Sequence, residues 1–315
     1  MPGVAQLSRN ENPYGPGPAA LRAIADAASC GCYYSHGGEG RLSAMIAERH
    51  GLTPEQVMMG AGSSEVLNCA AISLPADGHI LAPELFFQEA VNWAEEKGRK
   101  VVRLPLRADM QIDLEAMAAA VTPETRLVYI VNPNNPTGLM LDGPSLRAFQ
   151  AKLPKETTLL VDEAYMELTP DPARDSVVDL VRSGENVVVA RTFSKIHGLA
   201  GMRVGYAMAR PDLLAKMKPW AMNFGGNTAG IAAATASYQD AAFLAESKAR
   251  IIEARGMIEA AAKQAGLKAL PSSANFVFVE VPDAERLRAA MEGRKILIRP
   301  PYGRFKTWSR VSTGR

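Results

Sequence analysis

Short runs of apolar and β-branched residues alternate with longer amphipathic stretches between about residues 55 and 210. This alternation predicts a mostly parallel sheet with helices on both of its faces. The expected helices cover residues 64–74, 88–97 and 145–153. The seven expected strands cover residues 56–60, 79–84, 100–106, 126–133, 158–165, 186–193 and 203–209.

The pattern changes at about residue 235, which predicts a second and smaller unit. Residues 238–266 show one long helical pattern rich in Ala, Glu and Arg. A short strand, a helix and a final strand are then expected over 275–281, 283–293 and 296–301. The Pro- and Gly-rich opening at 10–18 suits neither a regular helix nor a central strand, so it predicts an extended arm packed on the rest of the chain.

These patterns divide an α/β protein into three expected parts. Residues 1–33 would form an N-terminal arm and part of the small domain. Residues 34–235 would form a large domain around the sheet, and residues 236–315 a small α+β domain.

Composition favours a protein that acts on small molecules. The chain has 315 residues, of which 47% are hydrophobic, enough for a large core. Its 35 basic and 33 acidic residues nearly cancel, which argues against a nucleic-acid partner. It lacks the run of ~20 apolar residues that a membrane helix needs, so we expect no membrane partner and a cytoplasmic location. Neither the three cysteines nor the four histidines have metal-ligand spacing, and no metal is expected.

The first candidate for chemistry is the glycine-rich turn at residues 60–67 (GAGSSEVL), which follows the first expected strand. Ser64 is expected to cap the helix that begins there, and free N–H groups at such a helix start bind phosphate well. A plain helix cap is the alternative, because many Gly-Ser turns do nothing more.

The second candidate is the loop NPNNPTG at residues 132–138, directly after an apolar strand. Two Asn-Pro pairs and a Gly force an irregular path at the carboxyl end of the strand, where open α/β sheets bind ligands. Asn135 would offer its side-chain amide to a ligand oxygen. A plain turn is the alternative.

The third candidate is Asp162, at the end of the apolar strand that leads into VDEAY. A carboxylate is expensive to bury unless it meets a cation or a strong donor. Asp162 is therefore expected to face a positive partner, which is either a protonated pyridine nitrogen of a ligand or a nearby arginine.

The fourth candidate is the segment 191–206 (RTFSKIHGLAGMRVGY), in which four polar side chains follow another apolar strand. Thr192 and Ser194 offer hydroxyls to a phosphate, and Arg203 can add a charge-assisted fork. Lys195 would be an amine that forms an imine. A lone lysine is nearly always a solvated surface group, which is the alternative, but this one lies between apolar runs and glycine turns.

Four motifs, taken together and in their order along the chain, resemble those of pyridoxal-5′-phosphate (PLP)-dependent aminotransferases of fold type I. They are GAGSSE, NPNNPTG, VDEAY, and TFSK with the following GLAG and Arg203. They are most similar to the histidinol-phosphate aminotransferase-like group. The resemblance implies a large domain with a mostly parallel seven-stranded sheet between helices, a smaller α+β domain, PLP as cofactor and a homodimer.

The resemblance also implies roles around the cofactor. Lys195 would hold PLP as a Schiff base and move the proton at the substrate carbon, while Asp162 would keep the ring nitrogen protonated. Asn135 and Tyr165 would hold the ring hydroxyl oxygen. Phe87 would stack on the ring, with Phe86 as its alternative and a purely structural role open for both. The phosphate group would be held by Gly62, Ser63, Ser64, Thr192, Ser194 and Arg203.

Four further residues match positions that bind substrate or reach a neighbouring subunit. Arg310 would receive the acidic group of the substrate, and Arg299 would add a second positive contact. Asn12 matches the arm that closes over the substrate. Tyr34 matches a tyrosine that reaches the cofactor phosphate of the neighbouring subunit, which is why a dimer is expected.

The implied reaction moves an amino group from an amino acid or a phosphorylated amine such as histidinol phosphate to a 2-oxo acid such as 2-oxoglutarate. A decarboxylase of the threonine-phosphate type would use the same lysine and aspartate, and a non-catalytic PLP-binding protein is a third reading. Two departures bear on these alternatives: the sequence stops at Arg315, so the small domain is expected to be shortened, and Ala90 stands where many relatives have a second aromatic residue.

Overall fold

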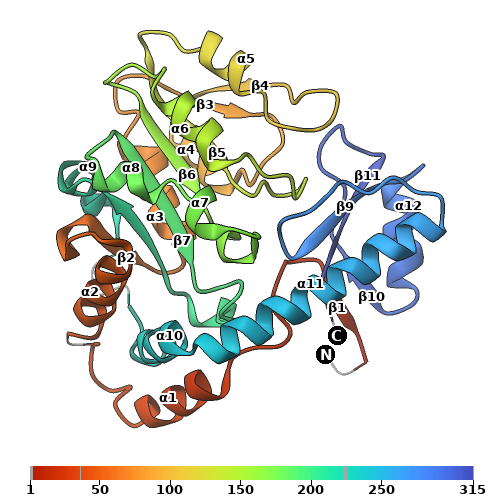
Figure 1. Cartoon of the computed structure of the whole chain (residues 1–315), viewed down its shortest axis with the longest axis horizontal. Coiled ribbons are helices and arrows are strands. Elements are labelled where there is room, and N and C mark those ends of the chain that lie inside the picture. Colours follow the sequence, from red (N-terminus) through yellow and green to blue (C-terminus); the bar gives the residue numbers. More distant parts are fainter. Residues whose placement is uncertain (1–2, 36, 223–225, 315) are drawn as a thin grey trace.

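The computed structural model describes residues 3–35, 37–222 and 226–314. Its centre is a seven-stranded sheet in the order β2-β8-β7-β6-β5-β3-β4 (Figure 1). β8 is antiparallel to both of its neighbours, and the remaining pairs are parallel. The strands are β2 (Val57–Gly60), β3 (His79–Pro83), β4 (Lys100–Leu104), β5 (Thr125–Val131), β6 (Thr158–Asp162), β7 (Val187–Thr192) and β8 (Gly205–Ala209). The prediction of a mostly parallel seven-stranded sheet is therefore confirmed.

Helices cover both faces of this sheet, because most of its strands carry apolar side chains on both sides. One face packs against α2 (Gly38–His50), α5 (Leu114–Ala119), α6 (Gly143–Gln150), α8 (Val178–Arg182) and α10 (Thr228–Gln239). The other face packs against α3 (Ser63–Ser73), α4 (Glu89–Glu96) and α9 (Pro211–Met217). Shorter helical segments are α7 (Pro172–Asp175), η1 (Pro54–Gln56), η2 (Met166–Leu168), η3 (Ala200–Met202) and η4 (Lys218–Trp220).

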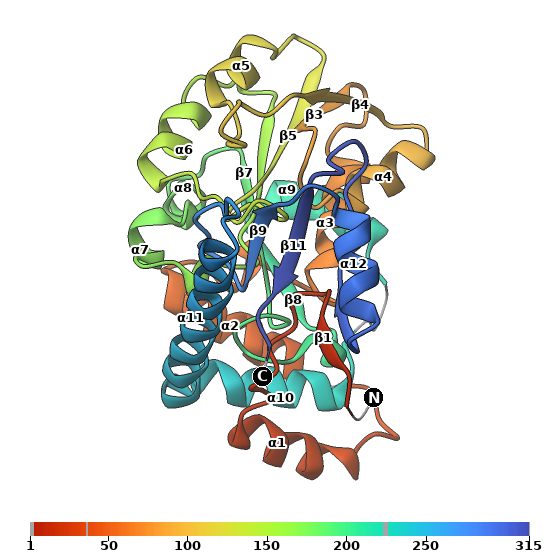
Figure 2. The same ribbon diagram turned by 90° about the vertical axis from the view of Figure 1, so that its right-hand side faces the viewer.

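A smaller α+β unit lies beside the large sheet, at the right of Figure 1 and toward the viewer in Figure 2. It contains the antiparallel pair β9 (Phe276–Glu280) and β11 (Trp308–Ser312), with α12 (Ala284–Glu292) and the long helix α11 (Ala241–Gln264). β10 (Ile296–Ile298) pairs in parallel with β1 (Ala5–Leu7) from the beginning of the chain.

The opening segment behaves as an extended arm, as its prolines and glycines predict. Residues 8–17 contain neither helix nor strand and run from β1 to α1 (Pro18–Ala28), which packs against α10. At Gly15, an added Cβ would lie 2.8 Å from the Cα of Gly198, so the arm passes very close to the loop after β7.

Three expectations about elements are wrong. The helix expected over 238–266 begins later, at Ala241 as α11, because Asp240 caps it by accepting from the Phe243 N–H; Tyr238 and Gln239 instead end α10, which was not expected. Ser64 is not the cap of α3, which begins one residue earlier, at Ser63. β1 and β11 were not expected, and β11 is the strand that carries Arg310.

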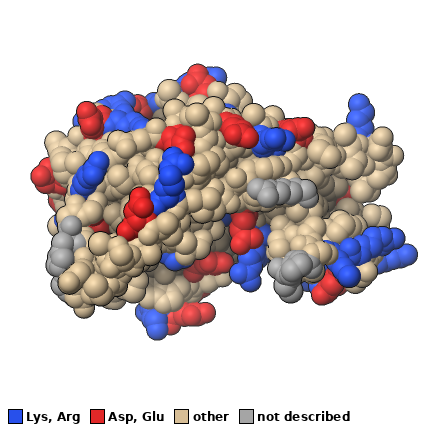
Figure 3. Space-filling model, turned by 90° about the horizontal axis from the view of Figure 1, so that it is seen from below, with Lys and Arg blue, Asp and Glu red and all other residues tan. Residues whose placement is uncertain are grey.

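Charged side chains are distributed rather than gathered. On the face drawn in Figure 3, basic and acidic groups are intermixed over most of the surface. Among the described residues, no helix is both long and apolar enough to cross a membrane.

Candidate active site

A cavity of about 800 Å³ opens where β5, β6 and β7 end, between the large sheet and the smaller unit. The loops after these strands and the beginning of α3 form one wall, while the arm and the segment before β11 form another. Most of the residues predicted to bind cofactor or substrate line it: Ser63, Ser64, Phe87, Asn135, Asp162, Tyr165, Thr192, Ser194, Lys195, Arg203, Arg299 and Arg310.

An acid and an amine with shifted pKa values share this cavity. Asp162, the last residue of β6, is 2% exposed, and its Oδ1 accepts from the backbone N–H of Ala164 at 3.1 Å. Burial raises the pKa of Asp162 to about 7, against the opposing effects of that N–H and of the positive charge on Lys195. Burial and the positive charge of Arg310 lower the pKa of the Lys195 amine to about 8. Lys195 can therefore supply a neutral, nucleophilic amine near neutral pH.

The guanidinium of Arg203, which lines the cavity, is held in place by hydrogen bonds. It adopts a left-handed backbone conformation, and its Nη1 donates to Ala200 O at 2.9 Å and to Ser194 Oγ at 3.4 Å. Thr192 donates to Ser194 at 2.9 Å, so the two hydroxyls are oriented together. Gly62, with a φ of +77°, lies beneath the guanidinium, and a Cβ there would come within 2.2 Å of Nη2.

Tyr165, Asn135 and Arg310 form a connected group that also lines the cavity. Arg310 is 4% exposed, and its Nη1 donates to Asn135 Oδ1 at 2.6 Å. Its Nη2 donates to Ser8 O, and its buried Nε has no hydrogen-bond partner among the described residues. Asn135 Nδ2 lies 3.5 Å from the hydroxyl oxygen of Tyr165. Burial raises the pKa of Tyr165 above the range of ordinary solution pH, so its hydroxyl stays protonated.

Two aromatic residues and a second arginine complete the lining. Phe87 is partly exposed in the cavity, whereas Phe86 is 2% exposed and packs edge-on against Tyr129 at a centroid distance of 5.3 Å. Both residues line the cavity, and the greater exposure of Phe87 favours it over Phe86 as the ring-stacking residue. The guanidinium of Arg299 lies 5.4 Å from the ring centre of Tyr302, which also lines the cavity.

Three predicted residues do not line this cavity. Gly62 lies next to the Arg203 guanidinium, in a space that a Cβ would fill. Tyr34 is 67% exposed at the surface. Asn12 is not positioned to contact a substrate, because its Nδ2 is bonded to Ile196 O at 2.8 Å and to Ser247 Oγ at 2.6 Å, where it anchors the arm. The arm residues that line the cavity are Arg9, Asn10 and Glu11.

Asn10 is the residue that the sequence-based prediction missed. It is 1% exposed, has a φ of +57°, and its Nδ2 donates to the Tyr165 hydroxyl at 3.0 Å. The motif NENP contains two asparagines in similar surroundings, and the local pattern does not indicate which of them faces the cavity. Asparagine tolerates a left-handed conformation better than most residues, which is the one signal that a sequence could have offered.

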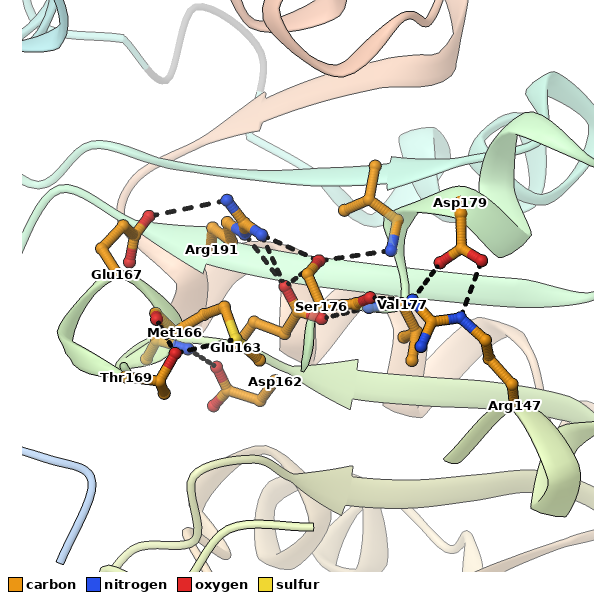
Figure 4. Close-up of polar contacts among 12 residues, drawn as sticks. Arg147, Asp162, Glu163, Met166, Glu167, Thr169, Ser176, Val177, Asp179 and Arg191 are labelled. Carbon is orange, nitrogen blue, oxygen red and sulfur yellow. Dashed lines mark hydrogen bonds and ion pairs between the residues drawn. The ribbon is translucent and has the colours of Figure 1, made fainter. Parts of the chain in front are cut away.

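Glu163 and Arg191 form a buried ion pair, whose contacts are shown in Figure 4. Glu163 and Arg191 follow and precede the lining residues Asp162 and Thr192, so their side chains leave β6 and β7 on the opposite face of the sheet. Arg191 donates to Glu163 Oε2 from Nη2 at 2.8 Å and from Nε at 3.0 Å. Ser176 donates to the same oxygen at 2.9 Å. The pair joins the two strand ends that carry the acid and the hydroxyl of the cavity.

The chemistry of these donors can be compared with that of PLP. An arginine backed by glycine, with two hydroxyls and the start of a helix, suits a phosphate group. A buried carboxylate suits a protonated ring nitrogen, and an amine with a lowered pKa suits imine formation. The residues present therefore fit PLP. Fold and site together define a PLP-dependent enzyme of fold type I.

Comparison with known proteins assigns the chain more closely. Residues 2–314 match the family described as aminotransferase class I and II. Histidinol-phosphate aminotransferase 2 of Ralstonia nicotianae is 39% identical, covering 99% of this chain and 84% of the relative. The histidinol-phosphate aminotransferase of Anaeromyxobacter sp. is 35% identical, over 99% and 86%. The crystal structure of histidinol-phosphate aminotransferase from Sinorhizobium meliloti in complex with pyridoxal-5′-phosphate matches with a TM-score of 0.90 and 32% identity, over 98% and 86%. The chain therefore belongs to the class I and II aminotransferases, and it is a PLP-dependent enzyme that transfers amino groups.

Proposed function

We propose that this aminotransferase takes the amino group of histidinol phosphate and passes it to a 2-oxo acid such as 2-oxoglutarate. The observation that supports this substrate is the buried guanidinium of Arg310, which lines the same cavity as Lys195. A guanidinium suits a phosphate and a carboxylate alike, so it can serve both the amine donor and the oxo-acid acceptor. The names of the relatives support the choice of histidinol phosphate.

Each side chain then has a defined task. When bound, PLP supplies an electron-withdrawing ring that stabilises negative charge on the substrate carbon. Asp162, ionised above its pKa of about 7, holds a proton on the ring nitrogen, and Asn135 and Tyr165 hold the ring hydroxyl oxygen. Lys195 would hold the cofactor through its amine, and its free amine would move the proton at the substrate carbon.

The remaining residues bind and orient. Arg203 clamps the phosphate group from one side, and Phe87 covers a face of the ring. Arg310 receives the acidic group of the substrate, with Arg299 as a second positive contact at the mouth. The other members of the phosphate clamp are Gly62, Ser63, Ser64, Thr192 and Ser194.

A dimer belongs to the same proposal. Tyr33 and Tyr34 are 69% and 67% exposed, and Trp220 and Met222 are 53% and 60% exposed. Thr228, at the start of α10, donates to Tyr33 O at 3.1 Å, so the tyrosine segment lies against that helix. Apolar side chains exposed to this extent favour association with a second copy, in which Tyr34 would reach the partner's cofactor phosphate. A cytoplasmic location completes the proposal, as is usual for enzymes of amino-acid biosynthesis.

The test of the reaction is absorption spectroscopy of the protein loaded with PLP. Histidinol phosphate should convert the spectrum to that of the aminated cofactor, and 2-oxoglutarate should restore it. Histidinol, which lacks the phosphate, should act much more weakly. The substrate assignment fails if histidinol phosphate leaves the spectrum unchanged while another amino acid converts it, and release of carbon dioxide would point to decarboxylation. For the dimer, the mass in solution should be twice that of the chain, and Tyr34→Ala should weaken the binding of PLP.

A further inference from the structure

The arm residue Asn10 makes hydrogen bonds to three separate parts of the chain. Its Nδ2 donates to the Tyr165 hydroxyl at 3.0 Å. Its backbone N donates to Ser312 Oγ at 3.0 Å, and its Oδ1 accepts from that same hydroxyl at 2.7 Å. Its backbone O accepts from Asn275 Nδ2 at 2.9 Å. Asn10 therefore joins the end of β6, the beginning of β9 and the end of β11 at the wall of the cavity.

The orientation of the Asn10 amide follows from Ser312. This serine is 1% exposed, and its oxygen already accepts from the backbone N–H of Asn10, so its own proton needs an acceptor. In the observed arrangement, that acceptor is Asn10 Oδ1. If the amide were turned over, the Ser312 proton would have no acceptor among the described residues, and a buried unpaired donor is costly. Ser312 thus holds the amide with its NH₂ group toward Tyr165.

The amide in turn determines what the Tyr165 hydroxyl can do. Its oxygen accepts from Asn10, and Asn135 approaches it as a second donor at 3.5 Å. No protein acceptor for the Tyr165 proton is present in the part of the chain that the structure describes. Other charged or titratable groups that face Tyr165 are Lys195, whose Nζ lies 5.5 Å from the ring centre, with Arg310, Asp162 and Tyr302. The hydroxyl proton is left to point into the cavity.

We propose that Asn10 is a positioning residue, which, held by Ser312, directs the hydroxyl proton of Tyr165 into the cavity and toward the ring oxygen of the cofactor. The inference rests on the proposed function, because it requires Tyr165 to contact that oxygen. The arm would then help to set the pKa of the bound cofactor. This effect would depend on the hydrogen bonds between Asn10 and Ser312 of β11. A donated hydrogen bond stabilises the ionised form of the ring oxygen, so it lowers the pKa of the bound cofactor.

The decisive variant is Asn10→Asp, which has almost the same shape. Its carboxylate still accepts from Ser312, but it offers Tyr165 an acceptor in place of a donor. The Tyr165 proton should then turn away from the cavity. In the holoenzyme, the pKa read from the pH titration of the cofactor absorption should rise by about one unit, the equivalent of one hydrogen bond. kcat/KM should fall about tenfold for glutamate and for histidinol phosphate alike, because the effect acts on the cofactor and not on either substrate.

Three companion variants separate this role from a structural one. Asn10→Gly keeps the left-handed backbone and removes the amide, and it should also raise the cofactor pKa. Ser312→Ala frees the amide to turn and should give a smaller shift in the same direction. Ser309→Ala is the matched control on β11, since its hydroxyl is buried with no hydrogen-bond partner among the described residues, and it should leave the titration unchanged. Thermal unfolding of each cofactor-free variant shows whether it folds.

The background variant Tyr165→Phe decides the mechanism. Tyr165→Phe alone should raise the cofactor pKa, and adding Asn10→Asp to it should change nothing further if Asn10 acts through the tyrosine proton. A further shift of similar size in that background would mean that the new charge acts directly on the cofactor, and it would overturn the proposal. An unchanged titration in Asn10→Asp alongside a shift in Tyr165→Phe would also overturn it, while leaving the proposed function intact. An unchanged titration in Tyr165→Phe would remove the assignment of Tyr165 to the cofactor and the inference with it.

Discussion

Arg310 and Asn135 share a hydrogen bond of 2.6 Å between Nη1 and Oδ1, which links the proposed anion-binding arginine to the proposed cofactor-binding amide. The two residues are separated by 175 positions in the sequence, and they come from β11 and from the loop after β5. Asn135 has its other amide atom directed at Tyr165. If Asn135 holds the ring hydroxyl oxygen as proposed, its side chain alone would separate the ring from an acidic group bound by Arg310.

Replacing Arg310 by Lys should impair both halves of the reaction. A lysine keeps the charge but loses the planar fork that can bind Asn135 and a substrate acid together. We expect kcat/KM for histidinol phosphate and for 2-oxoglutarate to fall at least about tenfold, since a hydrogen bond to a charged group contributes about 1.5–3 kcal/mol. Steady-state kinetics are the measurement, and Arg288→Lys, on the exposed face of α12, is the control. If Arg310→Lys had the same kcat/KM as the parent enzyme, Arg310 would not be a substrate-binding residue.

Replacing Gly62 by Ala should weaken cofactor binding. The added Cβ would lie 2.2 Å from Arg203 Nη2, so the guanidinium must leave its position. The dissociation constant for PLP, measured by fluorescence titration, should rise about tenfold, because overpacking of this kind typically costs about 1–3 kcal/mol. Gly98→Ala is the matched control: Gly98 also has a positive φ, of +89°, but a Cβ there meets nothing within 4 Å. Both variants should lose some stability from backbone strain, and only Gly62→Ala should lose affinity.

Lys195 should lower the stability of the cofactor-free protein. Because burial lowers its pKa from 10.5 to about 8, the folded state resists its charged form. Below pH 8 the folded state carries the full penalty, and the penalty fades as the pH rises from about 8 toward the unfolded value of 10.5. Lys195→Met, measured without PLP, should therefore unfold at a higher temperature than the parent at neutral pH. The difference should shrink in alkaline buffer, and a difference that stayed constant with pH would contradict the assignment of this pKa.

The ion pair between Glu163 and Arg191 should be a major source of stability behind the cavity. Their side chains are 0% and 8% exposed, so Arg191→Met leaves a buried carboxylate without its cation. Breaking such a pair typically costs about 3–5 kcal/mol, and Glu163→Gln added to Arg191→Met should restore part of this loss. Denaturant unfolding measures both. The surface pair of Arg288 with Glu285 provides the comparison, where Arg288→Met should have a far smaller effect on stability, because water screens an exposed ion pair. Similar losses in the two single variants would mean that water reaches Arg191.

The meeting of residues at strand ends could be predicted from the sequence. Contacts between segments that lie far apart in the sequence could not. Asp162 and Thr192 each end an apolar strand, and parallel strands bring their carboxyl ends to one edge, so their meeting follows from the pattern alone. Asn10 and Ser312 are 302 positions apart, and no local pattern connects them. β11 was missed because Ser309, Arg310 and Ser312 are polar although buried, which removes the alternation that marks a strand. The break at Asp240 did carry a signal, since aspartate is a preferred helix cap, but the helical composition continues across it.

The pairing of the arm with the late part of the chain also has a consequence for biosynthesis. β1 and Asn10 leave the ribosome before the rest of their domain, whereas their partners in β10 and β11 leave it some 290 to 300 residues later. The seven-stranded sheet is complete by Ala209, so it can fold on the nascent chain while the arm is still unpaired. Arg310 and Ser312, which bonds Asn10, are synthesised after the whole sheet. A nascent chain can thus hold the lysine and the aspartate in place well before it can bind a substrate acid.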